Sequence, residues 1–102
     1  MPLNPLVFQK SLIYYREKNW LILVEAVATG GPVDAIRHSE LSNLFRTSTA
    51  GLVFVTAFPD RGEVMRKFLS VVAWETEVWC ASDTSHLIHF NGIRFLGPYV
   101  KP

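Results

Sequence analysis

The chain lacks the features by which secreted and membrane proteins are usually identified. Cys80 is its only cysteine, so no internal disulfide can form, and a reducing cytoplasm is the expected compartment. The N-terminus has neither the basic stretch nor the apolar run of a signal peptide. The longest apolar stretch, residues 20–27, contains Glu25 and is less than half as long as a bilayer-spanning helix. We therefore predict a cytoplasmic protein that does not cross a membrane.

An excess of charge is also absent, because 10 basic residues balance 9 acidic ones. No large field of one sign is available to attract a polyanion, although a local patch is compatible with this balance. The 102 residues, 49% of them hydrophobic, are enough for one core but not for two domains of ordinary size. We therefore predict a single domain, residues 1–102.

The apolar pattern predicts a β-sheet that contains parallel and antiparallel strands. Residues 12–15 and 20–27 are rich in β-branched, aromatic and aliphatic side chains, and polar residues 16–19 separate them, which is typical of an antiparallel hairpin. Residues 51–58 form a similar run after a helical segment, so this strand should lie parallel to residues 20–27. Because residues 20–27 are apolar at nearly every position, we expect helices on both faces of the sheet.

Two helices are expected. Asp34 can cap a first helix that ends near Phe45, with an inner stripe of Ile36, Leu41, Leu44 and Phe45. Pro59 and Asp60 open a second helix that continues to about Trp74, in which apolar residues recur at three- and four-residue spacing. Asp60 and Glu63 have the spacing of a capping box at its start.

The C-terminal part predicts further strands. Residues 77–80 form a short strand, and residues 86–90 and 93–96 flank Asn91-Gly92, a dipeptide that favours a type I′ hairpin turn. The predicted fold class is α/β (α+β), with a mixed β-sheet that combines an antiparallel hairpin, a β-α-β unit, two helices and a C-terminal β-hairpin.

Glu25 most needs an explanation, because an unpaired carboxylate inside a buried strand costs several kcal/mol. If the hairpin turns through residues 17–18, Lys10 lies opposite Glu25 on the neighbouring strand. Arg37, His38 or Glu40 on the following helix could reach the same strand end. A strand-end acid that only pairs with Lys10, with no catalytic role, explains these residues equally well.

Several segments together resemble the C-terminal part of the BsuBI/PstI-type type II restriction endonucleases. They are NWLILVEAV (19–27), GPVDAIRHSEL (31–41), GLVFVTAFPDR (51–61), AWETEVWCA (73–81) and HLIHFNGIRFLGPY (86–99). The resemblance is specific because the segments occur in order with short spacers. It implies a restriction-endonuclease-like core of the PD-(D/E)XK type, without the family's N-terminal region. It also implies Mg²⁺-dependent hydrolysis of duplex DNA in a restriction-modification system by a homodimer. A longer partner subunit is the alternative partner if the domain performs no chemistry.

The resemblance assigns only Glu25 as a metal ligand. In PD-(D/E)XK nucleases, an acid on the neighbouring strand joins this glutamate to hold Mg²⁺, and a lysine follows two residues later. Here position 10 is lysine and position 27 is valine. An ion pair between Lys10 and Glu25 would weaken Mg²⁺ binding. The catalytic candidates are Glu25, Lys10, Arg37 and Glu40, and the alternative is a catalytically degenerate domain that binds DNA or another protein.

Four further residues are candidates for DNA contact. Arg61 could bind a phosphate near a helix N-terminus, and His89, Asn91 and Arg94 surround the last predicted hairpin and could reach a groove. Solvated side chains and a turn role for Asn91 are the competing explanations. Cys80 has apolar neighbours and is most simply a buried thiol.

Overall fold

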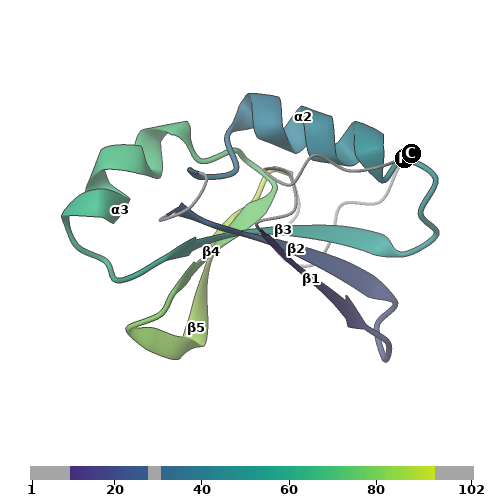
Figure 1. Ribbon diagram of the computed structural model, residues 1–102, viewed down its shortest axis with the longest axis horizontal. Helices are drawn as coiled ribbons and strands as arrows, with labels where there is room; N and C mark the ends of the chain where they lie inside the picture. The colour runs from purple at the N-terminus through teal and green to yellow at the C-terminus, as the bar shows by residue number, and fades with distance from the viewer. Residues whose placement is uncertain (1–9, 28–30, 94–102) are drawn as a thin grey trace.

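The computed structural model describes residues 10–27 and 31–93. They contain one twisted, five-stranded sheet with strand order β1-β2-β3-β4-β5 (Figure 1). The strands are β1 (Lys10–Tyr15), β2 (Trp20–Ala26), β3 (Gly51–Phe58), β4 (Thr76–Cys80) and β5 (Asp83–Phe90). The helices are α2 (Ala35–Leu44), α3 (Glu63–Phe68) and the 3-10 helix η1 (Leu69–Val71). Strands β2, β3 and β4 run parallel, and both edge strands are antiparallel to their neighbours. The predicted mixed sheet with a β-α-β unit is confirmed.

The first hairpin has the predicted register, in which Lys10 is the Cα partner of Glu25 and Tyr15 is the partner of Trp20. Asn19 closes the turn with φ 54°, a left-handed conformation that asparagine tolerates better than most residues. Tyr14 Oη donates to Asn19 Oδ1 at 2.8 Å, and the amide of Gly51 donates to the Asn19 carbonyl at 2.9 Å. The turn therefore also fixes where β3 begins beside β2.

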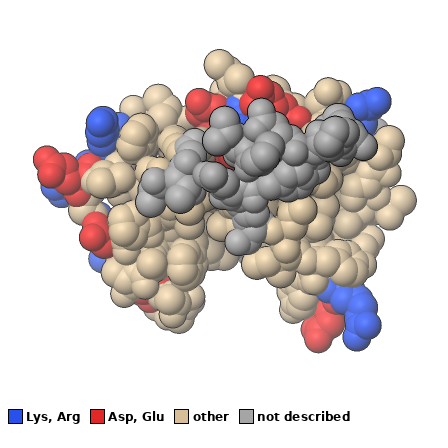
Figure 2. All heavy atoms as spheres, viewed as in Figure 1, with Lys and Arg blue, Asp and Glu red and all other residues tan. Residues whose placement is uncertain are grey.

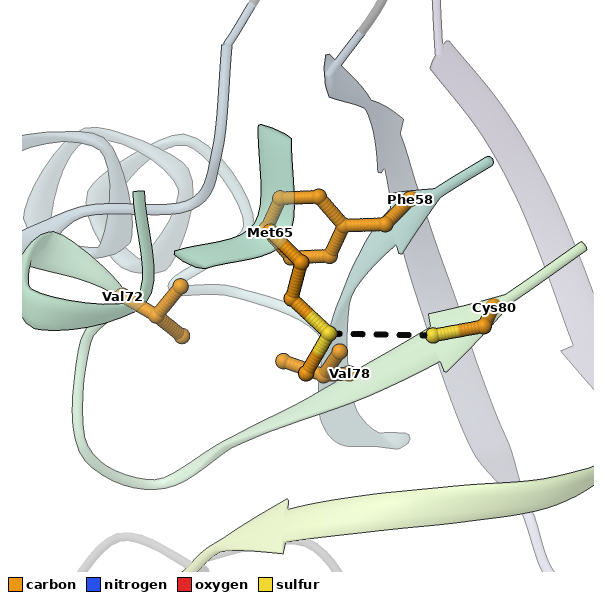
Figure 3. Packing of buried hydrophobic residues seen from close by; sticks show 5 residues of the cluster. All are labelled: Phe58, Met65, Val72, Val78 and Cys80. Carbon is orange, nitrogen blue, oxygen red and sulfur yellow. Dashed lines mark hydrogen bonds between the residues drawn. The ribbon is translucent and has the colours of Figure 1, made fainter. Parts of the chain in front are cut away.

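Two clusters of buried side chains join the sheet to the helices. Beneath α2, the cluster contains Leu23, Val33, Leu41 and Phe54. Beneath α3 and η1, the cluster contains Phe58, Met65, Val72, Val78 and Cys80 (Figure 3). The Sγ of Cys80 lies 3.9 Å from the Sδ of Met65, and burial raises the pKa of this thiol. Cys80 is thus a protonated packing residue, as the sequence predicted.

The helices lie on one face of the sheet, and the expectation of helices on both faces is wrong for the described residues (Figure 1). Ile36 was also expected on the inner stripe of the first helix, yet it is 72% exposed, whereas Leu41 is buried. Positions five apart on a helix are separated by about 140° around its axis, so these two residues cannot share a face. No helix in the described ranges is long and apolar enough to span a bilayer.

The second helix begins later and ends earlier than predicted. Its N-cap is Gly62, which makes no side-chain cap bond, so the capping box of Asp60 and Glu63 is wrong. Asp60 Oδ1 instead accepts the amide of Gly62 at 2.6 Å, because an aspartate before a glycine readily closes its own local turn. The α-helical part ends at Phe68, and η1 continues only to Val71.

The C-terminal hairpin also differs from its prediction. Strand β5 begins at Asp83 and not at residue 86, because β4 and β5 join through a short turn with a register shift at Trp79/Cys80. Neither Asn91 nor Gly92 has the positive φ that a type I′ turn requires. Residues 94–96 of the predicted last strand lie outside the described residues.

Candidate active site

Glu25 lies at the carboxyl end of β2, on the sheet face that the helices cover. Because β2 and β3 are parallel, Glu25 is the Cα partner of Thr56 at the same edge. Thr56 Oγ1 accepts the amide of Val33 at 3.0 Å, and Asp34 Oδ1 accepts the amide of Arg37 at 2.8 Å. The first bond ties the segment before α2 to β3, and the second caps the helix. Together they hold the first turn of α2 beside Glu25.

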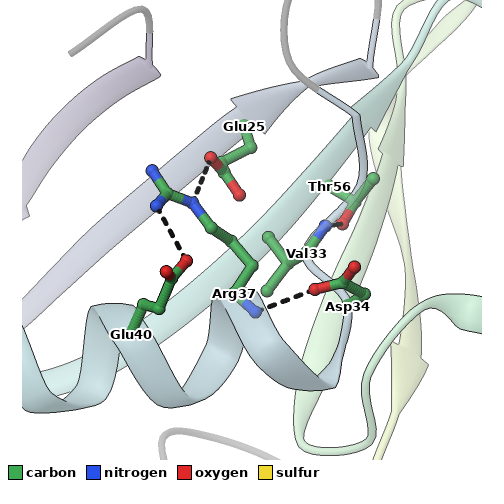
Figure 4. A network of polar contacts seen from close by, with 6 residues as sticks. All are labelled: Glu25, Val33, Asp34, Arg37, Glu40 and Thr56. Carbon is green, nitrogen blue, oxygen red and sulfur yellow. Dashed lines mark hydrogen bonds and ion pairs between the residues drawn. The ribbon is translucent and has the colours of Figure 1, made fainter. Parts of the chain in front are cut away.

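Arg37 connects Glu25 to Glu40 (Figure 4). Its Nε donates to Glu25 Oε1 at 2.9 Å, and its Nη1 donates to Glu40 Oε1 at 3.2 Å. Glu25 is buried, Arg37 is mostly buried and Glu40 is exposed. We call these three residues the Glu25–Arg37–Glu40 network. It connects a buried strand-end carboxylate to the solvent.

Glu25 has a strongly perturbed acidity. Burial is the largest cause, followed by the charges of Asp34 and Glu40, and together they raise the pKa of Glu25 to about 7. The Arg37 guanidinium opposes this rise, because it favours the ionised carboxylate. A carboxyl group that titrates near neutral pH is common at functional sites.

The remaining residues predicted at this strand end differ in their placement. The backbone of Lys10 lies opposite Glu25, as the hairpin register predicted. Val27, at the position of the motif lysine, packs against the cluster beneath α3. His38 packs edge to face against Phe54 with ring centroids 4.7 Å apart, and burial lowers its pKa, so its ring faces the core and not the network. Of the three helix candidates, Arg37 contacts Glu25, and Glu40 joins the network through Arg37.

The DNA-contact candidates do not gather around Glu25. Arg61 is exposed before α3, Asn91 follows β5, and Arg94 lies outside the described residues. His89 Nδ1 forms a hydrogen bond with Oε1 of Glu77 on the opposite face of the sheet. This Glu77–His89 pair was not among the residues predicted from the sequence. The available signal was an acid inside a short apolar strand, as for Glu25.

The described part of the chain contains no group of three or more His, Cys, Asp and Glu side chains arranged to hold a metal ion. Glu25 and Glu40 are the carboxylates that Arg37 brings together, and Asp34 lies close enough to affect the acidity of Glu25. Any ion at this site would need further ligands from water or from a bound substrate.

Comparisons with known proteins agree on one family. The chain is 60% identical over 88 residues to the type II restriction enzyme BsuBI of Bacillus subtilis, covering 86% of this chain and 28% of that enzyme. It is 34% identical over 85 residues to the type II restriction enzyme AplI of Arthrospira platensis, covering 83% of this chain and 26% of the relative.

The fold gives the same result. The solved structure of SdaI restriction endonuclease matches with a TM-score of 0.74 and 52% identity, over 88% of this chain and 28% of that chain. This chain therefore spans less than a third of the length of each of these relatives. Residues 10–93 match the family model of the BsuBI/PstI restriction endonuclease domain, and the chain belongs to that family.

Proposed function

We propose that this domain acts on duplex DNA in a restriction-modification system, in the cytoplasm, and that the Glu25–Arg37–Glu40 network is its centre for phosphodiester hydrolysis. The observation that carries the proposal is Glu25, a carboxylate that is 6% exposed, ion-paired to Arg37 and titrating near neutral pH. It occupies the strand end where family resemblance assigns a metal-binding glutamate. The type II restriction enzymes among its relatives support this reaction class.

Type II restriction endonucleases generally use a divalent metal, and the donors at this site have the chemistry that Mg²⁺ prefers. Glu25 and Glu40 supply hard carboxylate oxygens, and Mg²⁺ in such enzymes typically takes one or two carboxylates together with phosphate and water. The raised pKa of Glu25 indicates that its surroundings favour additional positive charge. We assign Glu25 and Glu40 as the residues that would hold the ion, which when bound would activate water and neutralise phosphate charge.

Within this proposal, Arg37 has two tasks. Its hydrogen bond fixes the orientation of the Glu25 carboxylate, and its guanidinium provides the positive charge that attracts a phosphate to the strand end. Lys10, opposite Glu25 in the hairpin, places a second basic residue at the same edge. For DNA recognition, the proposal includes a homodimer or a longer partner subunit. The residues that would contact the DNA are Arg61, His89, Asn91 and Arg94.

A second function is favoured by one observation at the same site. Arg37 already neutralises Glu25, and lysine occupies position 10, where the resemblance implies an acid. A domain with this arrangement can bind DNA or pair with another chain without performing chemistry. In that case the basic residues at the strand end serve only to attract the phosphate backbone.

Plasmid nicking by the purified protein in Mg²⁺ and in Mn²⁺ tests the proposal. We expect nicked or linear product, a loss of at least about 100-fold in Glu25→Gln, and no loss in the control Glu17→Gln, which alters the exposed hairpin turn. Absence of cleavage by the wild-type protein in both metals would reject the enzymatic function. Salt-dependent duplex binding without cleavage would then support the second function, and no binding at low salt would reject its DNA-binding form.

A further inference from the structure

Arg37 lies between the two carboxylates that the proposed function assigns to the metal ion. Its Nε donates to Oε1 of Glu25 at 2.9 Å, and its Nη1 donates to Oε1 of Glu40 at 3.2 Å. One guanidinium therefore holds an oxygen of each carboxylate, and Figure 4 shows it between the two acidic side chains. A cation of the protein itself is thus bound to the oxygens that a divalent ion would need.

The guanidinium and a divalent ion compete for these oxygens. Mg²⁺ binds carboxylate oxygens at about 2.1 Å. An ion on Oε1 of Glu25 would lie no more than about 5 Å from Nε of Arg37, because that nitrogen is 2.9 Å from the same oxygen. Two cations at this separation repel each other, and the repulsion is strong where the site is mostly buried. Glu25 therefore binds one of the two cations tightly, but not both.

The charges around this strand end favour a divalent cation. Glu25, Asp34 and Glu40 contribute three negative charges when ionised, and Arg37 contributes one positive charge, so these four residues have a net charge of −2. Figure 2 shows acidic side chains over α2, at the top of the molecule, with a basic group between them. This excess of negative charge repels a DNA phosphate, and a divalent ion would balance it.

Arg37 can leave the carboxylates without a movement of the helix. Its backbone amide donates to Asp34 Oδ1 at 2.8 Å, and the Val33 amide donates to Thr56 Oγ1 at 3.0 Å, so the first turn of α2 is held independently of the guanidinium. The guanidinium also contacts Glu40, whose side chain is 59% exposed, and therefore lies at the solvent edge of the site. Rotation about the side-chain bonds of Arg37 is sufficient to turn it outward.

We propose that Arg37 exchanges with the divalent ion: Glu25 and Glu40 pass from the guanidinium to the ion, and the released guanidinium binds a phosphate of duplex DNA. The inference rests on the proposed function, because it requires an ion and DNA at this strand end. Each ligand is bound better once Arg37 has left Glu25, so Mg²⁺ and DNA bind cooperatively. Arg37 thereby suppresses ion binding in the absence of DNA and strengthens it in the presence of DNA.

Nitrogen-15 NMR of the wild-type protein tests the exchange at pH 8, above the pKa of Glu25 of about 7. The Nε signal of Arg37 is identified by its absence in Arg37→Lys. During titration with Mg²⁺ it should move to the position of an exposed arginine, because the hydrogen bond to Glu25 is lost. The signal of exposed Arg66 on α3 should not move, and Na⁺ at equal ionic strength should move neither signal.

Calorimetric titration with Mg²⁺ gives an independent measure without DNA. Arg37→Met should bind Mg²⁺ at least about tenfold more tightly than the wild-type protein, because the competing cation is removed. A permanent positioning role for Arg37 predicts the opposite change, since Glu25 would lose its orientation. Arg66→Met is the control and should leave the affinity unchanged. Circular dichroism checks folding, and if Arg37→Met is unfolded, Arg37→Lys replaces it and must also bind Mg²⁺ more tightly, because its single ammonium cannot bridge both carboxylates.

Fluorescence anisotropy with a labelled duplex of arbitrary sequence tests the phosphate contact. Arg37→Met should weaken duplex binding at least about fivefold in Mg²⁺ but not in EDTA, because only the released guanidinium reaches the DNA. An Arg37 signal that stays in place at saturating Mg²⁺, or losses of equal size in Mg²⁺ and EDTA, would overturn the exchange. Plasmid cleavage by a protein whose Arg37 signal does not move would leave the proposed function intact and reject only the exchange. Failure of the wild-type protein to bind Mg²⁺ would reject both the exchange and the assigned ion site.

Discussion

Glu25 and Glu77 are equally buried, at 6% exposure each, but they lie on opposite faces of the same sheet and have different partners. Glu25 is paired with Arg37, which stays charged at any physiological pH and extends the network to Glu40. Glu77 is paired with His89, a neutral-or-charged donor ring in place of a guanidinium, and this pair does not extend to a second carboxylate in the described residues. Burial alone therefore does not identify a functional carboxylate, because the partner and the neighbouring charges decide its acidity and what it can bind.

The largest expected change in the free energy of unfolding comes from removing the permanent charge of Arg37 beside Glu25. Arg37→Met should lower the free energy of unfolding at pH 8 by about 3 kcal/mol, because it leaves a buried carboxylate without its partner. At pH 5.5, below the pKa of Glu25 of about 7, the carboxyl group is protonated and the loss should be much smaller. Urea denaturation at both pH values measures this difference, with Arg66→Met on the exposed side of α3 as the control. Equal losses at the two pH values would contradict the pairing.

A second, smaller effect is expected in the pH dependence of the wild-type protein. The pKa of Glu25 is raised in the folded state from 4.5 to about 7, so the folded state binds more protons than the unfolded state between these values. Stability should therefore fall as the pH rises from about 4.5 to about 7, by about 2 kcal/mol after a discount for solvent screening of the neighbouring charges. Glu25→Gln should remove this component from the denaturation profile. Parallel profiles for the two proteins would show that Glu25 is not responsible.

Substitutions in the Glu77–His89 pair, on the other face of the sheet, should change the free energy of unfolding less. His89→Leu should lower the free energy of unfolding by about 1–2 kcal/mol, because Glu77 loses its hydrogen-bond partner. Adding Glu77→Gln to this variant should recover part of the loss. His86→Leu is the matched control on the same strand, since His86 bonds to exposed Asp83 and Ser85 and its replacement should change stability by less than about 0.5 kcal/mol. The two histidine variants are compared by thermal unfolding, and equal effects would reject the structural role of His89.

The features that depend on local periodicity were predictable from the sequence. The hairpin register that places Lys10 opposite Glu25 followed from one turn position, and the limits of β3 followed from its apolar run. The helix after Asp34 was also predicted, because an N-cap residue and the following pattern are both local signals. The prediction for Asp60 was wrong, because its side chain closes a turn with Gly62 where a cap was expected.

The features that depend on three-dimensional packing were not predictable in the same way. The apolar pattern of β2 indicates two covered faces, but it does not indicate which chain segment supplies each cover. Similarly, the sequence indicated that Arg37, His38 or Glu40 could reach Glu25, but not which of them does. Only the orientation of α2 sends Arg37 to Glu25 and turns His38 onto Phe54.

Calorimetric titration with Mg²⁺ tests most directly whether Glu25 lies at an ion-binding centre whose affinity Lys10 suppresses. The wild-type protein should bind Mg²⁺ weakly, Glu25→Gln should not bind it, and Lys10→Asp should bind it at least about tenfold more tightly, because it replaces the cation opposite Glu25 with a second carboxylate. Unchanged affinity in both Glu25→Gln and Lys10→Asp would contradict the assignment of this strand end as the metal-binding site.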